Sequence, residues 1–195
     1  FSNYYGIWQD KSRGRVKMSK AALARSYLDK DSQLVVAFDE SLDNIIGHAF
    51  FKVFHSEAVN REVTWITQLV VRSEYRGQKV AQRMLNAAIS PTVGCAGLVT
   101  SHPHAVKALE RAMRKKVDPA MCKILAAKVI EESRIEYLKD RDFVFHGNSC
   151  LVNTAFAVDH AEPEAALAAL VDTNTADWVL GSLLDGHEFV AVILA

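Results

Sequence analysis

The chain has 195 residues, of which 50% are hydrophobic and 24% are charged, and 23 basic residues balance 23 acidic ones. A chain of this length can bury a core without help from disulfides or metals. Its net charge of zero gives no electrostatic basis for binding nucleic acid or an anionic membrane, and no apolar run is long enough to span a bilayer. We therefore expect one domain over residues 1–195, located in the cytoplasm or, alternatively, the nucleus.

The cysteines and the clustered histidines predict neither a disulfide framework nor a metal site. Cys95, Cys122 and Cys150 are odd in number, widely separated and form no C-x-x-C pair. Free thiols in a reducing compartment are the expected state. His102 and His104 flank a proline without a further ligand at helical spacing, which is a poor basis for tetrahedral zinc.

The first part of the chain predicts a helix followed by three strands. Ser19 is a typical N-cap for a helix over residues 20–28. Residues 33–38, 45–55 and 62–71 are rich in β-branched and aromatic side chains, which favour strands. The short spacing between these strands predicts an antiparallel meander.

The third strand runs directly into a short polar loop that opens a helix over residues 82–89. Helix N-termini carry unpaired N–H groups and a positive dipole end, so the loop at residues 76–81 predicts a phosphate site. Arg76 adds a cation there, and Gly77 allows close approach of the backbone to a ligand. The alternative is an ordinary strand–turn–helix connection with a charged loop. Residues 95–100 predict a further strand, parallel to 62–71 because the crossover is right-handed.

The remaining elements alternate helices and strands. Pro103 begins a helix to residue 113, and a second helix runs from residues 118–119 to about 137. Residues 142–145 and 151–158 predict strands, Pro163 opens an alanine-rich helix to residue 171, and residues 186–194 form the last strand.

The strand and loop at residues 69–81 resemble the coenzyme-A (CoA) site of the GNAT acetyltransferase superfamily. The family pattern is Leu-x-Val in the strand, then Arg/Gln-x-x-Gly-x-Gly/Ala. Arg76 and Ala81 occupy the first and last positions of the loop motif, and Lys79 stands where the family usually has glycine. A second family pattern, Asn-x-x-Ala-x-x-Leu-Tyr-x-Lys, resembles the helix after residue 101, with His102 replacing asparagine and Leu109 replacing tyrosine. The resemblance covers about residues 34–112.

This resemblance implies an α/β fold with a mixed, mostly antiparallel sheet flanked by helices, and makes residues 114–140 a helical insertion. It implies transfer of an acetyl group from acetyl-CoA, without a metal, to a primary amine by direct attack in a ternary complex. The acceptor is a small molecule or a peptide, and a homodimer is compatible with the family. The implied CoA-binding residues are Leu69, Val70, Val71, Arg76, Gly77, Gln78, Lys79, Val80, Ala81 and His102.

An alternative function is a CoA-binding or protein-interaction module that kept the fold and lost turnover. Lys79 and Leu109 depart from the family motifs and favour this alternative. The intact strand and loop at residues 69–81 favour a protein that at least binds the cofactor.

Several side chains remain candidates for the proton transfers. Glu62 lies near the position where family members often place the acid that deprotonates the amine, although it is equally compatible with a solvated strand end. Thr67 occupies another such position, and His48 and His55 have the ordinary pKa range for this role. For protonating the CoA thiolate, the candidates are His102, Ser101 and Tyr137.

Charge is distributed unevenly along the chain. Lysine and arginine stop at Arg141, so the later part carries only acidic side chains and histidine. Asp159, Glu162, Asp185 and Glu188 are therefore candidates for an acidic wall near the acceptor mouth, which would attract a cationic amine. The alternative is a solvated acidic face balanced by basic helices elsewhere.

Overall fold

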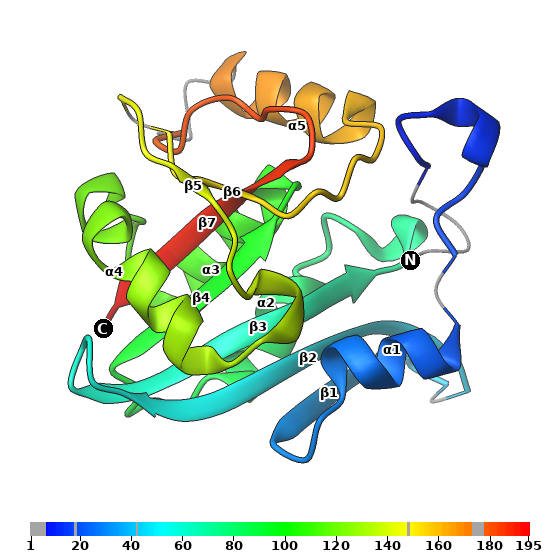
Figure 1. Ribbon diagram of the computed structural model, residues 1–195. Helices are drawn as coiled ribbons and strands as arrows, with labels where there is room; N and C mark the ends of the chain where they lie inside the picture. The colour runs from blue at the N-terminus through cyan, green and yellow to red at the C-terminus, as the bar shows by residue number, and fades with distance from the viewer. Residues whose placement is uncertain (1–6, 18, 42, 148, 173–177) are drawn as a thin grey trace.

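One seven-stranded mixed sheet organises the protein in the computed structural model, which describes residues 7–17, 19–41, 43–147, 149–172 and 178–195. Its strands are β1 (Ser32–Phe38), β2 (Ile45–Ser56), β3 (Arg61–Val71), β4 (Cys95–Thr100), β5 (Phe143–Val144), β6 (Leu151–Asn153) and β7 (His187–Leu194). Their spatial order is β1-β2-β3-β4-β7-β6-β5 (Figure 1). The late strand β7 therefore lies beside β4 at the centre, so both halves of the chain share one sheet.

Helices cover both faces of this sheet. The α-helices are α1 (Lys20–Tyr27), α2 (Val80–Ala88), α3 (Pro103–Met113), α4 (Pro119–Ser133) and α5 (Ala161–Asp172), and the 3₁₀ helices are η1 (Lys11–Arg13), η2 (Ser73–Tyr75) and η3 (Glu136–Leu138). Helices α1 and α4 lie in front of the sheet in Figure 1, whereas α2 and α3 lie behind it. Helix α5 packs against α3 near the β5–β6 edge. The predicted α/β fold, with a mixed sheet flanked by helices, is confirmed.

The meander and the crossover are also confirmed. Strands β1, β2 and β3 pair antiparallel in sequence order, and β3 and β4 pair parallel, with α2 in the connection between them. The Ser19 side chain caps α1 by accepting a hydrogen bond from the Ala22 amide at 3.1 Å. These elements follow local sequence signals, which explains why the sequence alone predicts them.

Strands β3 and β4 separate toward their carboxyl ends. Their pairing runs from Val63 and Cys95 to Ile66 and Leu98 and includes no later residue of either strand. The pairing of β3 with β2 shifts register at the same level, and the extra residue on β3 is Thr67. A bulge of this kind bends the strand and strengthens its twist. The end of β3 therefore diverges from β4 beyond Ile66, and we call this opening the splay.

The core beside the splay depends on one glycine. Trp65 is fully buried on β3, and Gly97 pairs with it on β4. A Cβ atom added at Gly97 would lie 2.4 Å from the Trp65 ring, so only glycine allows the indole to lie flat against β4. This packing holds the two strands in fixed register up to the point where they separate.

Several predicted boundaries differ from the structure, and three of these differences have a clear cause in the backbone or its hydrogen bonds. Helix α4 ends at Ser133 and not near Tyr137, because Arg134 adopts a left-handed conformation with φ 52° and a separate η3 follows. Strand β6 ends at Asn153 and not at residue 158, since Ala155 has φ 55° and the pairing with β7 stops at Asn153. Helix α5 begins two residues before Pro163 because the Asp159 carboxylate accepts a hydrogen bond from the Ala161 amide at 2.9 Å.

Candidate functional site

The loop between β3 and α2 precedes a helix whose first amides lie outside the helical hydrogen-bond ladder. The first amide bonded within the helical ladder belongs to Arg83, which donates to the Lys79 carbonyl at 3.0 Å. The amides of residues 80–82 precede this ladder and therefore have no partner inside the helix. Gly77 has φ 75°, and a Cβ atom added there would meet no atom within 4 Å. The loop therefore borders open space that an anionic group can enter.

Lys79 has an unusual backbone conformation at the start of α2. It is the N-cap residue with φ 64° and ψ 14°, its side chain makes no capping hydrogen bond, and it is exposed. Residues with a Cβ atom pay about 1 kcal/mol in this left-handed region, whereas glycine pays nothing. The position that departs from the sequence motif is thus a position where the backbone favours glycine.

Arg76 forms an ion pair with Glu162 from the first turn of α5. The Arg76 Nε atom also donates to the Val71 carbonyl at 3.3 Å, which holds the guanidinium over the end of β3. The Nε2 atom of His102 lies 3.8 Å from the same carboxylate oxygen of Glu162. A carboxylate therefore neutralises the cation of the loop in this structure.

His102 caps α3 and is neutral at ordinary pH. Its Nδ1 atom accepts a hydrogen bond from the His104 amide at 3.2 Å, which leaves the ring proton on Nε2. Burial, followed by the nearby His104 ring, lowers the pKa of His102 to about 4. The sequence places His102 where the family motif has asparagine, and the structure gives it the capping role that an asparagine side chain can also fill.

The other side of the splay carries polar groups from β2 and β3. The His48 Nε2 atom lies 2.9 Å from the Gln68 side-chain oxygen, and burial lowers the pKa of His48. Both residues lie on the end portions of their strands, in register with the part of β3 that leaves β4. Of the two histidines considered as bases, the structure brings His48 to the splay.

Tyr137 reaches the bulge from η3. Its hydroxyl donates to the Thr67 carbonyl at 3.4 Å, and its ring lies 5.2 Å from that of Tyr27. Burial raises the pKa of Tyr137 well above its ordinary value, so the phenol keeps its proton. The Thr67 hydroxyl is buried and has no hydrogen-bond partner among the described residues. Of the three candidates for the acid, Tyr137 is therefore held against the bulge itself.

Glu188 is a functional candidate that sequence reasoning placed only at the rim. It pairs with Val152 of β6, and its neighbour Phe189 pairs with Thr100 at the end of β4. Burial raises the pKa of Glu188, while the Thr154 hydroxyl and the Ser101 backbone amide, both near the carboxyl, lower it less. The charge of Glu188 in turn raises the pKa values of Tyr27 and Tyr137. The sequence signal for this role is a lone acid followed by the six apolar residues of β7.

Glu62 and His55 lie at the opposite end of the strands. They are direct register partners, and both are exposed. Glu62 lies seven positions before Leu69 on β3, which amounts to roughly 23 Å along an extended strand. Leu109, at the position of the family tyrosine, is fully buried in the core. The structure therefore does not bring Glu62 to the splay, and it supplies no phenol from α3.

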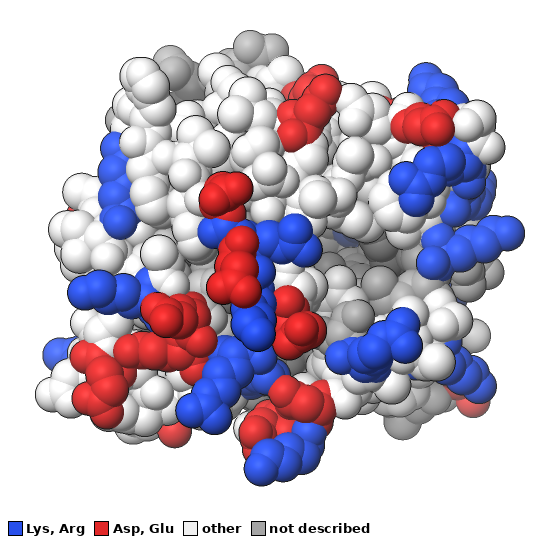
Figure 2. Space-filling view, viewed as in Figure 1, with Lys and Arg blue, Asp and Glu red and all other residues white. Residues whose placement is uncertain are grey.

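Two of the acidic side chains considered for an acidic wall, Asp159 and Asp185, accept hydrogen bonds from other residues of the protein. Asp159 caps α5, and Asp185 accepts a hydrogen bond from the Gln9 side chain at 2.7 Å. Figure 2 shows acidic groups intermixed with basic ones on the lower part of this face and only scattered acidic groups above. On this face, the observation favours a mixed surface over a continuous acidic wall.

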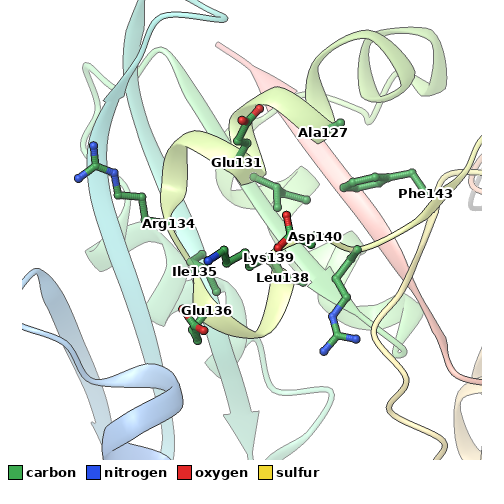
Figure 3. A pocket seen from close by; sticks show the side chains of 11 residues that line it. Ala127, Glu131, Arg134, Ile135, Glu136, Leu138, Lys139, Asp140 and Phe143 are labelled. Carbon is green, nitrogen blue, oxygen red and sulfur yellow. The ribbon is translucent and has the colours of Figure 1, made fainter.

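A separate hollow of about 540 Å³ lies between the end of α4, η3 and β5. Figure 3 shows charged side chains around it, including Glu131, Lys139 and Asp140, with the Phe143 ring on the opposite side. Glu136 and Leu138 of η3 line this hollow, whereas Tyr137 between them reaches the Thr67 carbonyl of β3. The hollow is thus distinct from the splay.

The three cysteines are free and buried, as predicted. Burial raises the pKa of Cys95 to about 12, so this thiol stays protonated. Within the described ranges, the structure gathers no group of three or more metal-ligating side chains. None of the described helices combines the length and apolar character needed to cross a membrane.

Comparison with known proteins gives a family. A model of the acetyltransferase (GNAT) family matches residues 2–116. No curated protein matches the sequence significantly. Similar solved structures include Tetrahymena GCN5 (12% identity, 49% of this chain and 58% of that chain, TM-score 0.37). The NatC complex bound to Gag peptide and CoA also matches, with 21% identity over 50% of this chain and 65% of that chain and a TM-score of 0.36.

A third match is the aminoglycoside acetyltransferase meta-AAC0020 from an uncultured soil metagenomic sample, in complex with sisomicin. It is 17% identical over 36% of this chain and 45% of that chain, with a TM-score of 0.29. In all three cases the match spans less than two thirds of the other chain.

Proposed function

Since the chain belongs to the acetyltransferase (GNAT) family, we propose that it transfers an acetyl group from acetyl-CoA to a primary amine in a ternary complex. One observation carries this proposal: β3 leaves β4 beyond Ile66 directly beside the loop whose amides open α2. We also propose that residues 1–195 form one domain, with α4 as an insertion, because β7 pairs with β4 inside the same sheet.

The residues at the splay fit CoA. Open space above Gly77 and the amides of residues 80–82, which have no partner inside the helix, suit a pyrophosphate, and Arg76 supplies a cation. The unpaired edge of β3 offers amides and carbonyls to the amide groups of the pantetheine arm. The proposed CoA-binding residues are Leu69, Val70, Val71, Arg76, Gly77, Gln78, Lys79, Val80, Ala81 and His102. Bound there, acetyl-CoA supplies the acetyl group, its C–S bond breaking as the amine nitrogen bonds to the carbonyl carbon.

In this proposal, groups of the protein orient the thioester and supply a proton to the departing sulfur. Backbone amides at the diverging end of β3 are donors that a thioester oxygen can accept from, which stabilises developing negative charge. Tyr137 holds its proton beside the bulge because burial raises its pKa. We assign Tyr137 the role of donating a proton to the departing sulfur, and the proton that the acetylated nitrogen loses restores the phenol. His102 is neutral, so it contributes a hydrogen-bond donor and not a positive charge.

A second candidate is the CoA-binding module without turnover. The Arg76–Glu162 ion pair favours it, because a carboxylate competes for the cation that CoA needs. The burial of Leu109 favours it as well, since α3 presents no phenol.

Two measurements on the full chain distinguish these functions. Titration calorimetry with CoA reports binding, and release of free thiol from acetyl-CoA reports transfer to spermidine, a lysine peptide or glutamate. Binding with turnover of at least one amine supports the transferase. Binding without turnover supports the module, and absence of both contradicts each of them.

A further inference from the structure

A partly buried carboxylate lies across the splay from the bulge of β3, on β7. The pairing of Phe189 with Thr100 places Glu188 level with Ser101, just beyond the end of β4. The pairing of Glu188 with Val152 fixes its backbone from the other side as well. Both neighbouring strands therefore hold the carboxyl group at the level where β3 has already left β4.

The groups around this carboxylate come from four elements. Tyr27 belongs to α1, Tyr137 to η3, Thr154 follows β6, and the Ser101 amide follows β4. Among the described residues, Glu188 forms no ion pair with lysine or arginine. The Thr154 hydroxyl lies near the carboxyl but outside hydrogen-bonding geometry. Glu188 is thus partly buried, and no lysine or arginine among the described residues forms an ion pair with it.

We propose that Glu188 is the catalytic base that removes a proton from the acceptor ammonium group, which rests on the acetyl transfer proposed above. In this step an N–H bond of the ammonium breaks and an O–H bond forms on the carboxylate. The products are a neutral amine and a carboxylic acid, and the acid returns its proton to solvent after transfer. Glu188 is partly exposed, which leaves part of its side chain accessible to an amine.

The environment suits this role better than that of Glu62. Burial raises the pKa of Glu188, and a carboxylate with a raised pKa is a stronger base toward an ammonium ion. Glu62 is exposed and lies at the far end of β3. Tyr137 interacts with both β3 and β7. Its hydroxyl donates to the Thr67 carbonyl, and the charge of Glu188 raises its pKa.

The experiment compares Glu188→Gln with wild type in acetyl transfer to spermidine and to a lysine peptide, across pH 6.5–9.5. We expect kcat/KM to fall about 100-fold at pH 7. The deficit should shrink as pH approaches the amine pKa of about 10, where the neutral amine forms without a base. Glu164→Gln, an exposed acid on α5, is the matched control and should match wild type.

Further variants separate base chemistry from structure. The affinity of Glu188→Gln for CoA should stay within twofold of wild type, because the loop before α2 is a separate part of the site. Glu188→Asp keeps the charge and should retain an intermediate rate with the wild-type pH dependence. A Glu188→Gln enzyme at full rate, or one whose deficit is the same at every pH, overturns this assignment and leaves the transferase standing. Wild type that binds CoA but acetylates neither amine overturns both.

Discussion

The guanidinium of Arg76 forms an ion pair with the carboxylate of Glu162, which joins the loop before α2 to the first turn of α5. The same guanidinium is the cation that we propose for binding the phosphates of CoA. Because the two charges attract each other, CoA must displace Glu162 or share Arg76 with it. Glu162→Gln removes the competing charge, and we expect the Kd for CoA to fall about threefold to tenfold. Titration calorimetry measures it.

The control for this prediction is Glu164→Gln, which removes an exposed acid from the same helix. It should leave the Kd unchanged. A Glu162→Gln protein with wild-type affinity would show that the phosphates bind away from Arg76.

Lys79 gives a prediction about stability. Its φ of 64° is costly for a residue with a Cβ atom, so Lys79→Gly should raise the free energy of unfolding by up to about 1 kcal/mol. Lys79→Ala keeps the Cβ atom and should give little gain. Urea denaturation of both variants measures the difference, and equal stability would contradict a strained N-cap.

The same pair of variants reports on CoA. If the lysine side chain contacts a phosphate, both variants lose affinity, whereas if it crowds the ligand, Lys79→Gly binds more tightly. We expect the second result. Equal affinities in all three proteins would mean that the side chain points to solvent in the complex.

The lowered pKa of His102 leads us to expect that the folded protein loses stability in acid. Its pKa is about 4 in the folded protein and about 6.5 in an unfolded chain, so the unfolded state binds more protons between these values. Stability therefore falls as pH drops from 6.5 toward 4, by at most about 3 kcal/mol from this group. His102→Asn keeps a capping oxygen and removes the titration.

Denaturant unfolding at pH 7.5 and at pH 4.5 measures the effect. We expect wild type to lose more stability than His102→Asn over this interval. His104 titrates in the same direction but is common to both proteins, so it cancels in the comparison. Identical losses would place the His102 ring in a solvated environment.

Gly77 gives a test of the loop itself. Gly77→Pro removes an amide donor and forces φ to about −65°, against 75° in the structure, so CoA binding should be lost. Gly77→Ala keeps the amide at a cost in backbone strain, and we expect it to retain measurable binding. Circular dichroism checks that both variants fold, and an unchanged Kd in Gly77→Pro would place the site elsewhere.

The sequence alone predicts the parts of the fold whose signals are local. β-branched and aromatic residues mark β1, β2 and β3, Ser19 marks the start of α1, and the loop motif marks the amides before α2. Boundaries after residue 133 are less predictable, because Arg134 and Ala155 adopt positive φ values that no glycine announces. The proposed phosphate loop is readable from the sequence because its donors are backbone groups set by neighbours in the chain.

Only the tertiary structure decides which side chains meet at the splay. Glu62 and residue 69 share one strand, but seven positions at about 3.3 Å per residue place Glu62 at the opposite end of β3 from the splay. Glu188 reaches the site through β7, which enters the sheet beside β4 some 90 residues later. Tyr137 and Glu162 arrive from two further elements. The sequence therefore determines the fold family and the backbone cradle, whereas long-range strand pairing decides the charged and proton-bearing groups around it.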